Sequence, residues 1–225
     1  VKKFIFISTV NAYNKKPIHQ TFDENRELVK KGNSYDVTKA LAQELVISSD
    51  GIETVSINPT SVLGKNDFKP SRLGKIVKGI HSGKLPFLVD GGLDVIDVED
   101  LSKAIYNSIN NGKNGHSYLI SGKFRSFKEI HQIIEKYQEK KSKVFFFPRL
   151  MVKLSLPLLS LFPIGLLKRA AEINGKLFPG LENMTKEAIE NIINFPKLID
   201  NSKAKKDLGL KISPIDKTIR DAIYE

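Results

Sequence analysis

The residues best suited to chemistry in this 225-residue chain are Tyr35 and Lys39, which stand four positions apart. In a helix this spacing puts both side chains on one face. An ammonium group there can lower the pKa of the neighbouring phenol, because a nearby positive charge favours the phenolate. Thr9, just after an apolar run, adds a hydroxyl that can hold a carbonyl oxygen. The three groups together favour proton transfer at a carbonyl or alcohol oxygen.

Three predicted elements must position these groups. The unbroken apolar run Phe4–Ile7 predicts a strand buried on both faces of a parallel sheet. Apolar residues at helical spacing predict a helix over Tyr35–Ser48, and Thr54–Ile57 predicts a second strand. Strand, long loop, helix and strand in this order form one crossover unit of an α/β sheet.

The rest of the chain continues this alternation before it becomes mostly helical. A helix is predicted over about 71–81, a strand over 93–97, a helix over 98–110 and a strand over 116–121. Ser126 and Glu129 have the spacing of a capping box, which predicts a helix from there to about Glu139. After Phe145 the pattern is mostly helical with proline breaks, and helices are expected to open at Thr185 and at Ser213-Pro214.

Composition excludes several classes of function. The chain has no cysteine, so disulfides and thiolate chemistry are excluded, and its four histidines lack metal-ligand spacing, so no metal is expected. The net charge of +11 is dispersed, and without a nucleic-acid-binding motif it indicates a solvated surface rather than a nucleic-acid partner. No signal peptide is visible, and the longest uncharged stretch, 154–167, is short for a membrane span. We therefore expect a soluble, cytoplasmic protein.

One absence matters as much as any motif. A doubly wound sheet that binds a dinucleotide normally begins with a strand, a glycine-rich turn and a helix. The chain has 15 glycines but no G-x-G-x-x-G, and it begins without methionine inside what reads as a middle strand. We therefore expect that the first mononucleotide-binding half is missing from this sequence.

Four segments of the chain form a recognisable set: 4–13, the pair Tyr35 and Lys39, the loop 58–64, and 69–74 with Gly91-Gly92 and 95–100. Together they resemble the extended short-chain dehydrogenase/reductase family (NAD-dependent epimerase/dehydratases), and within it the dihydroflavonol 4-reductase-like branch. In that family the first segment is the strand that ends at the active-site hydroxyl. Three residues depart from the family pattern: Thr9 replaces serine, Asp36 replaces a small residue and Gln43 replaces a frequent glutamate.

The resemblance implies a fold and an arrangement of domains. The expected fold class is α/β, the C-terminal part of a doubly wound parallel (Rossmann-type) sheet with a smaller, mostly helical substrate lobe. Residues 1–125 would form the partial dinucleotide-binding domain, with a substrate-lobe insertion at about 65–95. Residues 126–225 would form the helical lobe.

The resemblance also implies roles for individual residues. Thr9, Tyr35 and Lys39 would be catalytic, and Tyr35 and Lys39 would also contact the cofactor, NAD or NADP. Asn58 would reach the substrate or merely cap its turn. The loop that faces the nicotinamide would dock the carboxamide through its backbone, and its residues are Pro59, Thr60, Ser61 and Val62.

The expected activity is an NAD(P)-dependent oxidoreductase acting on a carbonyl or secondary alcohol of a small-molecule substrate. One alternative is a nucleotide-sugar epimerase or dehydratase that uses the same residues. Another is a non-catalytic fragment or pseudoenzyme that binds a partner or a membrane surface. A homodimer is possible in each case.

Three further features have simpler interpretations. Tyr137 and Lys141 repeat the Tyr-x-x-x-Lys spacing, but in a predicted Lys/Glu-rich helix, which indicates solvated surface. Asp97 and Asp100 are expected to cap the helix that starts near Val98 rather than bind a metal. Residues 144–167 are apolar with basic neighbours, and we expect lobe core or a pocket wall there in preference to a membrane contact.

Overall fold

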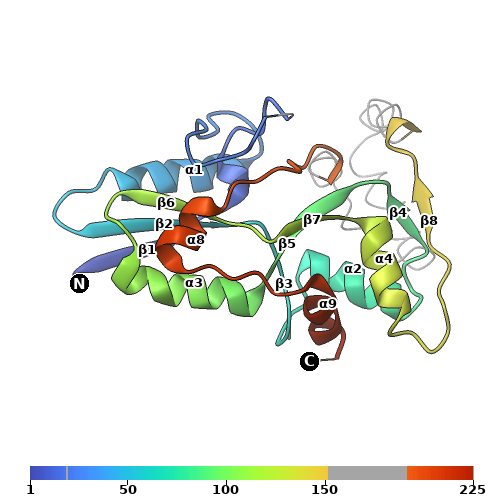
Figure 1. The fold of residues 1–225 in the computed structure, drawn as a ribbon. Helices are drawn as coiled ribbons and strands as arrows, with labels where there is room; N and C mark the ends of the chain where they lie inside the picture. The colour runs from blue at the N-terminus through green and yellow to red at the C-terminus, as the bar shows by residue number, and fades with distance from the viewer. Residues whose placement is uncertain (19, 152–191, 225) are drawn as a thin grey trace. The chain divides into compact units, whose positions relative to one another are not determined.

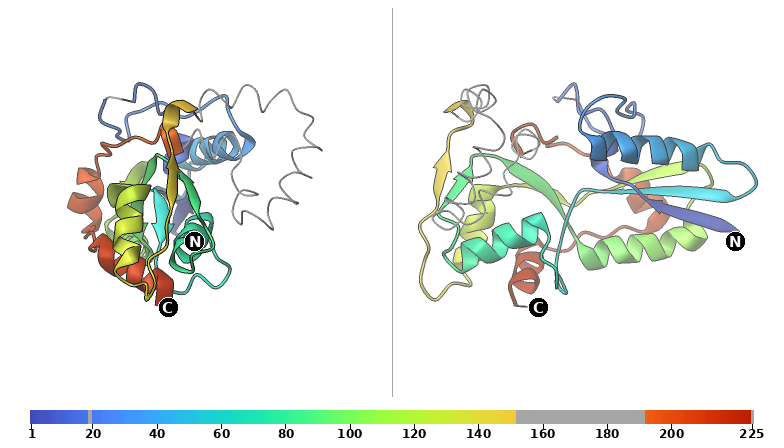
Figure 2. Two further views of the ribbon diagram at one scale, coloured as in Figure 1. Left: turned by 90° about the vertical axis from the view of Figure 1, so that its right-hand side faces the viewer. Right: turned by 180° about the vertical axis from the view of Figure 1, so that it is seen from behind.

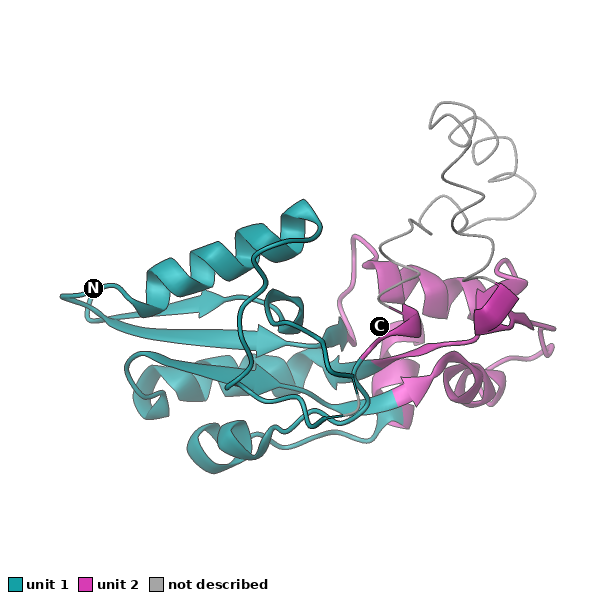
Figure 3. Cartoon of the chain, turned by 90° about the horizontal axis from the view of Figure 1, so that it is seen from above, with its two compact units in different colours: residues 1–62, 94–124, 196–215 teal, residues 63–93, 125–195, 216–225 magenta. Residues whose placement is uncertain are grey.

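The computed structural model describes residues 1–18, 20–151 and 192–224. The chain divides into two compact units, drawn in different colours in Figure 3. Unit 1 comprises residues 1–62, 94–124 and 196–215, and unit 2 comprises 63–93, 125–195 and 216–225. Residues 196–215 therefore belong to unit 1, whereas the sequence prediction assigned them to the helical lobe.

Unit 1 contains a parallel sheet of three strands. The strands are β1 (Lys3–Ile7), β2 (Glu53–Pro59) and β6 (His116–Ile120), in the order β1-β2-β6. Ile7 pairs with Ile57, and Pro59 pairs with Ile120, so the three carboxyl ends lie along one edge of the sheet. This register confirms the predicted crossover unit of an α/β fold.

The two faces of this sheet are chemically different. Side chains of β2 alternate between them, so Val55 and Ile57 point to one face while Ser56 and Asn58 point to the other. Helix α1 (Ser34–Ile47) covers the polar face and α3 (Val98–Asn111) covers the apolar one, with α8 (Ser202–Leu208) packed against α3 and β6 (Figures 1 and 2). The apolar core under α3 and α8 consists of Val55, Ile57, Ile96, Leu101, Ala104, Tyr118, Ile120, Ala204, Leu208 and Leu210.

Helix ends in unit 1 follow from local capping. Asn33 starts α1, because its side-chain oxygen accepts a hydrogen bond of 2.9 Å from the Asp36 amide. Asp97 caps α3 by accepting a bond of 2.8 Å from the Glu99 amide, which confirms the predicted cap. Asp100 does not cap α3. Its carboxylate instead accepts bonds of 2.6 and 3.1 Å from the amide and hydroxyl of Ser213.

Three short strands form a second sheet in the order β3-β5-β7. Their bounds are β3 (Ser61–Leu63), β5 (Gly92–Asp97) and β7 (Lys123–Ser126), and a 3₁₀ turn, η1 (Val10–Ala12), follows β1. Gly122, just before β7, lies against the β5 backbone, because a Cβ atom there would stand 1.8 Å from the Val95 carbonyl oxygen. This close approach requires glycine.

Unit 2 is built around two helices and a two-stranded sheet. Helix α2 (Arg72–His81) packs on α4 (Phe127–Glu135), and parallel strands β4 (Phe87–Val89) and β8 (Phe145–Phe147) pair beside them. The last helix, α9 (Ile215–Tyr224), follows Ser213-Pro214 as predicted. Ser126 and Glu129 form the predicted capping box at the start of α4.

Unit 2 also differs from the sequence prediction in two places. Helix α4 ends at Glu135 rather than near Glu139, so Tyr137 and Lys141 do not share a helix. The Tyr137 hydroxyl bonds to Asp216 instead, and this bond raises the pKa of the phenol. Residues 145–147 form a strand where a mostly helical region was expected. The predicted helix at Thr185 lies outside the described residues.

Candidate active site

The Lys39 ammonium group lies at the carboxyl end of β1. Its Nζ donates a hydrogen bond of 2.8 Å to the Ile7 carbonyl oxygen and stands 5.1 Å from the centre of the Phe6 ring. Ile7 is the last residue of β1, directly before Ser8 and Thr9. The carboxyl ends of parallel strands are where open α/β sheets bind ligands. Helix α1 therefore places a positive charge at the carboxyl edge of the sheet, which is the edge at which open α/β folds bind ligands.

Thr9 is fixed next to this charge. Only 8% of Thr9 is exposed, and its Oγ1 accepts a bond of 3.2 Å from the Asn11 amide, which starts η1. The hydroxyl uses a lone pair for this bond, so its own proton remains available to a further acceptor. The neighbouring Ser8 hydroxyl is also buried, and it has no hydrogen-bond partner among the described residues. The sequence analysis did not single out Ser8, although its place beside Thr9 was a usable signal.

Asn58 connects the ends of β1 and β2 to helix α1. It is fully buried, and its amide nitrogen donates bonds of 3.2 Å to the Thr9 carbonyl and 2.6 Å to Gln43 Oε1. Its side-chain oxygen accepts a bond of 3.0 Å from the Ser56 hydroxyl. Asn58 therefore holds the Thr9 backbone in place, a role that neither predicted alternative for Asn58 included.

Gln43 extends this network across the polar face of the sheet. Its amide nitrogen donates bonds of 2.9 Å to the Tyr13 hydroxyl and 3.2 Å to the Ser117 hydroxyl. Burial raises the pKa of Tyr13, so this phenol stays neutral in the ordinary pH range. Only 3% of Gln43 is exposed. An amide can donate and accept hydrogen bonds at once without carrying a charge, which explains why glutamine suits this buried position.

Tyr35 occupies the first turn of α1, one turn before Lys39 on the same helix face. It is 57% exposed, so its phenol is accessible to solvent and to a ligand. The structure thus gathers Thr9, Asn58 and Lys39 around the end of β1. The role of each residue in catalysis remains a prediction.

The loop predicted to face a nicotinamide leaves the carboxyl end of β2. Pro59 and Thr60 are buried, and Ser61 and Val62 are half-buried at the start of β3. The Thr60 hydroxyl donates a bond of 2.7 Å to Asp94, and its amide donates one of 3.1 Å to the Ile120 carbonyl. Both Thr60 donors are therefore engaged within unit 1, and cofactor contact by this loop remains a prediction.

Lys15 adds a titratable group that the sequence analysis missed. Burial lowers its pKa to about 8, and the Asp36 carboxylate opposes part of this shift. Asp36 directly follows Tyr35, so Lys15 belongs to the surroundings of the first turn of α1. A lysine with this pKa exchanges its proton close to neutral pH, which an ordinary lysine does not.

We expect Lys15→Met to stabilise the protein at pH 7 by about 2 kcal/mol, because the charged lysine is partly desolvated. The pKa in the folded state, about 8, lies below the ordinary value of 10.5. Between these values the unfolded chain binds more protons, so wild-type stability rises with pH and the advantage of the variant disappears near the upper value. Urea unfolding at several pH values measures this, with exposed Lys30→Met as the control. A difference that is independent of pH would contradict it.

Two negative findings hold for the described residues. Outside the masked positions, no group of three or more His, Cys, Asp or Glu side chains is placed to hold a metal ion. Within the same described part, no helix is both long and apolar enough to cross a membrane.

A parallel α/β sheet with a lysine and two hydroxyls at its carboxyl edge defines a Rossmann-type protein with a candidate proton-transfer site. The model of the NAD dependent epimerase/dehydratase family matches residues 1–121, which is more than half of the chain. The chain belongs to this family.

Two curated relatives share 25% identity with the chain. "Sterol demethylase protein B" of Methylococcus capsulatus aligns over 194 residues, covering 85% of this chain and 56% of the relative. "Putative dihydroflavonol 4-reductase" of Synechocystis aligns over 234 residues, covering 100% of this chain and 64% of the relative. The chain thus spans less than two thirds of either relative's length.

Solved structures support the fold. The crystal structure of gox2253 has a TM-score of 0.75 at 22% identity and covers 99% of this chain and 65% of its own. RMD from Pseudomonas aeruginosa, complexed with NADPH, has a TM-score of 0.65 at 15% identity over 98% of this chain and 65% of its own. UDP-glucuronic acid 4-epimerase from Bacillus cereus, in complex with NAD, has a TM-score of 0.65 at 17% identity over 98% and 60%. These TM-scores show a shared Rossmann-type fold.

Proposed function

We propose that this chain carries the proton-transfer site of an NAD(P)-dependent oxidoreductase that acts on a carbonyl or secondary alcohol. The observation that carries the proposal is the bond between Lys39 Nζ and the Ile7 carbonyl. It positions an ammonium group beside Ser8 and Thr9 at the carboxyl end of β1. The family match and the dihydroflavonol 4-reductase-like relative support a redox reaction of this class.

In the reducing direction the substrate oxygen becomes an alkoxide and needs a proton. Tyr35 is the proposed acid, and it becomes the base in the reverse direction. Lys39 follows one turn later on the same helix face and brings its positive charge to the same end of β1. Thr9 is proposed to donate its free hydroxyl proton to the same substrate oxygen.

The residues at this edge fit the nicotinamide end of a dinucleotide. Lys39 uses one of its three N–H groups on Ile7, which leaves two for a ribose hydroxyl. The Ser8 hydroxyl, which has no hydrogen-bond partner among the described residues, is a further donor at the same edge. When bound, the cofactor supplies or accepts the hydride. The sequence contains no glycine-rich phosphate turn, and we propose that the phosphates are held by a part of the protein outside these 225 residues.

A nucleotide-sugar epimerase or dehydratase is the second candidate. It would use the same Thr9, Tyr35 and Lys39 chemistry, and solved neighbours include a nucleoside-diphosphate-sugar epimerase and a UDP-glucuronic acid 4-epimerase. Epimerisation returns the cofactor to its starting redox state, whereas a reductase consumes one cofactor per product.

An activity screen of the full-length protein separates the candidates. The protein is incubated with carbonyl compounds and nucleotide sugars in the presence of NADH or NADPH and, in parallel, of NAD⁺ or NADP⁺, and both the net redox change of the cofactor and the product stereochemistry are followed. We expect stoichiometric cofactor oxidation with a carbonyl substrate. Inverted sugars without net oxidation would establish the epimerase, and inactivity toward every compound would favour a non-catalytic protein.

A further inference from the structure

One strand of unit 2 exposes large apolar side chains that the proposed function does not use. In β8, Phe145 is 63% exposed and Phe147 is 46% exposed, while Phe146 between them is half-buried. Because side chains alternate along a strand, Phe145 and Phe147 share the outward face. Leu150 and Met151, which follow, are 69% and 61% exposed. Monomeric proteins rarely expose so many large apolar groups together without a partner.

The outward direction of these rings is fixed by contacts on the opposite face of β8. The Phe146 ring meets the His131 imidazole edge-on with centroids 6.0 Å apart, and Lys128 Nζ stands 5.7 Å from its centre. On the outward side, the Phe87 ring of β4 lies 5.9 Å from Phe145 and 5.7 Å from Phe147. The strand therefore cannot bury both phenylalanines by turning over without losing the packing of Phe146.

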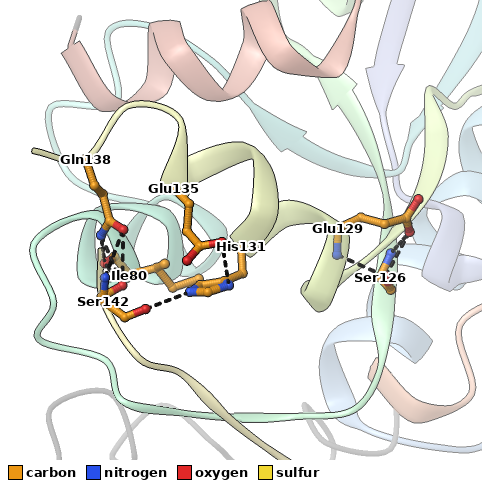
Figure 4. Close-up of polar contacts among 7 residues, drawn as sticks. All are labelled: Ile80, Ser126, Glu129, His131, Glu135, Gln138 and Ser142. Atoms are coloured by element: carbon orange, nitrogen blue, oxygen red, sulfur yellow. Dashed lines mark hydrogen bonds and ion pairs between the residues drawn. The ribbon is translucent and has the colours of Figure 1, made fainter. Parts of the chain in front are cut away.

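A basic turn directly before β8 is held at both of its ends, as Figure 4 shows. At one end, Gln138 donates bonds of 2.8 Å to the carbonyls of Ile80 and His81 at the end of α2. At the other end, the Ser142 amide donates a bond of 3.2 Å to Gln138 Oε1, and the Ser142 carbonyl lies 3.2 Å from a His131 ring nitrogen. The exposed residues Lys140 and Lys141 between these anchors are thus presented at a fixed place.

Charge and apolar exposure together define the partner. Residues 140–151 contain Lys140, Lys141, Lys143 and Arg149 and no acidic residue. A bilayer with anionic headgroups attracts lysines at its surface and accepts aromatic and aliphatic side chains at the headgroup boundary. Nucleic acid would also attract the lysines, and its bases could stack on phenylalanine, but neither interaction would bury the exposed aliphatic side chain of Leu150.

We propose that unit 2 docks on an anionic lipid bilayer through an aromatic-basic edge, defined as Lys140, Lys141, Lys143, Phe145, Phe147 and Leu150. The sequence alone favoured core or a pocket wall for residues 144–167. Residues 145, 147 and 150 are exposed, so for residues 144–151 we replace that expectation with a surface contact. Residues 152–167 lie outside the described residues. The docking surface does not depend on the proposed catalytic activity.

Cosedimentation with lipid vesicles tests the docking surface. We expect the protein to pellet with phosphatidylglycerol/phosphatidylcholine vesicles at low salt, and to pellet far less with pure phosphatidylcholine or at high salt. Phe145→Ser combined with Phe147→Ser should lower the partition coefficient at least about tenfold. Phe68→Ser, at a residue of unit 2 that is 87% exposed, is the matched control and should bind like the wild type.

Two triple lysine variants show whether binding depends on the lysines of this edge or only on the net charge of the protein. Lys140→Gln, Lys141→Gln and Lys143→Gln together should weaken binding at least about tenfold, since each surface lysine contributes roughly a fivefold factor. The control removes the same charge from exposed lysines of unit 1, and its substitutions are Lys205→Gln, Lys206→Gln and Lys211→Gln. This control should keep most of the binding. Circular dichroism confirms that all variants are folded.

Several results would overturn the proposal. A wild-type protein that stays in the supernatant with every vesicle has no such surface. Equal loss of binding in the two lysine variants would mean that net charge alone is responsible. Unchanged binding of the double phenylalanine variant would place the contact elsewhere. Binding to a single-stranded oligonucleotide without vesicle binding, or a dimer that the phenylalanine changes dissolve, would assign the edge to a different partner.

Discussion

Tyr35→Phe is expected to lower kcat of the full-length protein by about 10³-fold, within the range that a positioned proton donor contributes. The change removes only the phenolic oxygen, so the ring and its helix are kept. Because Tyr35 is 57% exposed, the free energy of unfolding should stay within about 0.5 kcal/mol of the wild-type value. Steady-state kinetics and urea unfolding measure the two quantities.

The matched control for Tyr35→Phe is Tyr106→Phe. Tyr106 is 69% exposed on α3 of the same unit, and α3 covers the face of the sheet opposite to α1. Its loss of a hydroxyl should leave both kcat and stability unchanged. If Tyr35→Phe retains kcat within threefold of the wild type, Tyr35 is not the acid and the proposed mechanism loses its central group.

Asn58→Leu is expected to give the largest loss of stability, about 3–5 kcal/mol. Leucine fills a similar volume but offers no hydrogen bond. The Thr9 carbonyl and Gln43 Oε1 would both lose their Asn58 partner, and each buried group left unsatisfied costs roughly 1–3 kcal/mol. Because the Thr9 backbone is also released, kcat should fall together with stability.

Urea unfolding of Asn58→Leu beside Asn110→Leu measures this effect. Asn110 is exposed on α3 of the same unit, so its replacement should change stability by less than about 0.5 kcal/mol. A Ser56→Ala variant keeps both hydrogen bonds donated by the Asn58 amide nitrogen and removes only the donor to its side-chain oxygen, so it should cost less, roughly 1–3 kcal/mol. An Asn58→Leu protein within 1 kcal/mol of the wild type would show that the buried network is not structural.

Features fixed by local chemistry could be predicted from the sequence. Two helix starts depend on spacing within a few residues, and the structure confirms both: the capping box of Ser126 and Glu129, and the Asp97 cap. The structure also confirms the crossover unit from β1 to β2, which was predicted from the pattern of apolar strands. The family assignment also followed from short motifs, and the family match supports it.

Features that depend on distant pairing could not be predicted. Strand β8 has only three residues, and it becomes a strand because β4, almost 60 positions earlier, offers a parallel edge. The contacts of Gln43 with Asn58 and Ser117 join three elements that are separated in sequence. The expectation that Phe4–Ile7 is buried on both faces was wrong for the described residues, because Phe4 is 46% and Ile7 38% exposed.

The central claim is that the Tyr35 phenol and the Thr9 hydroxyl converge on one substrate oxygen beside Lys39. A crystal structure of the full-length protein with its dinucleotide and a substrate analogue tests this most directly. We predict that Tyr35 Oη and Thr9 Oγ1 both lie within hydrogen-bonding distance, about 2.6–3.2 Å, of the same ligand oxygen. A ligand oxygen bound by neither group, or a Tyr35 phenol directed away from the end of β1, would contradict the account.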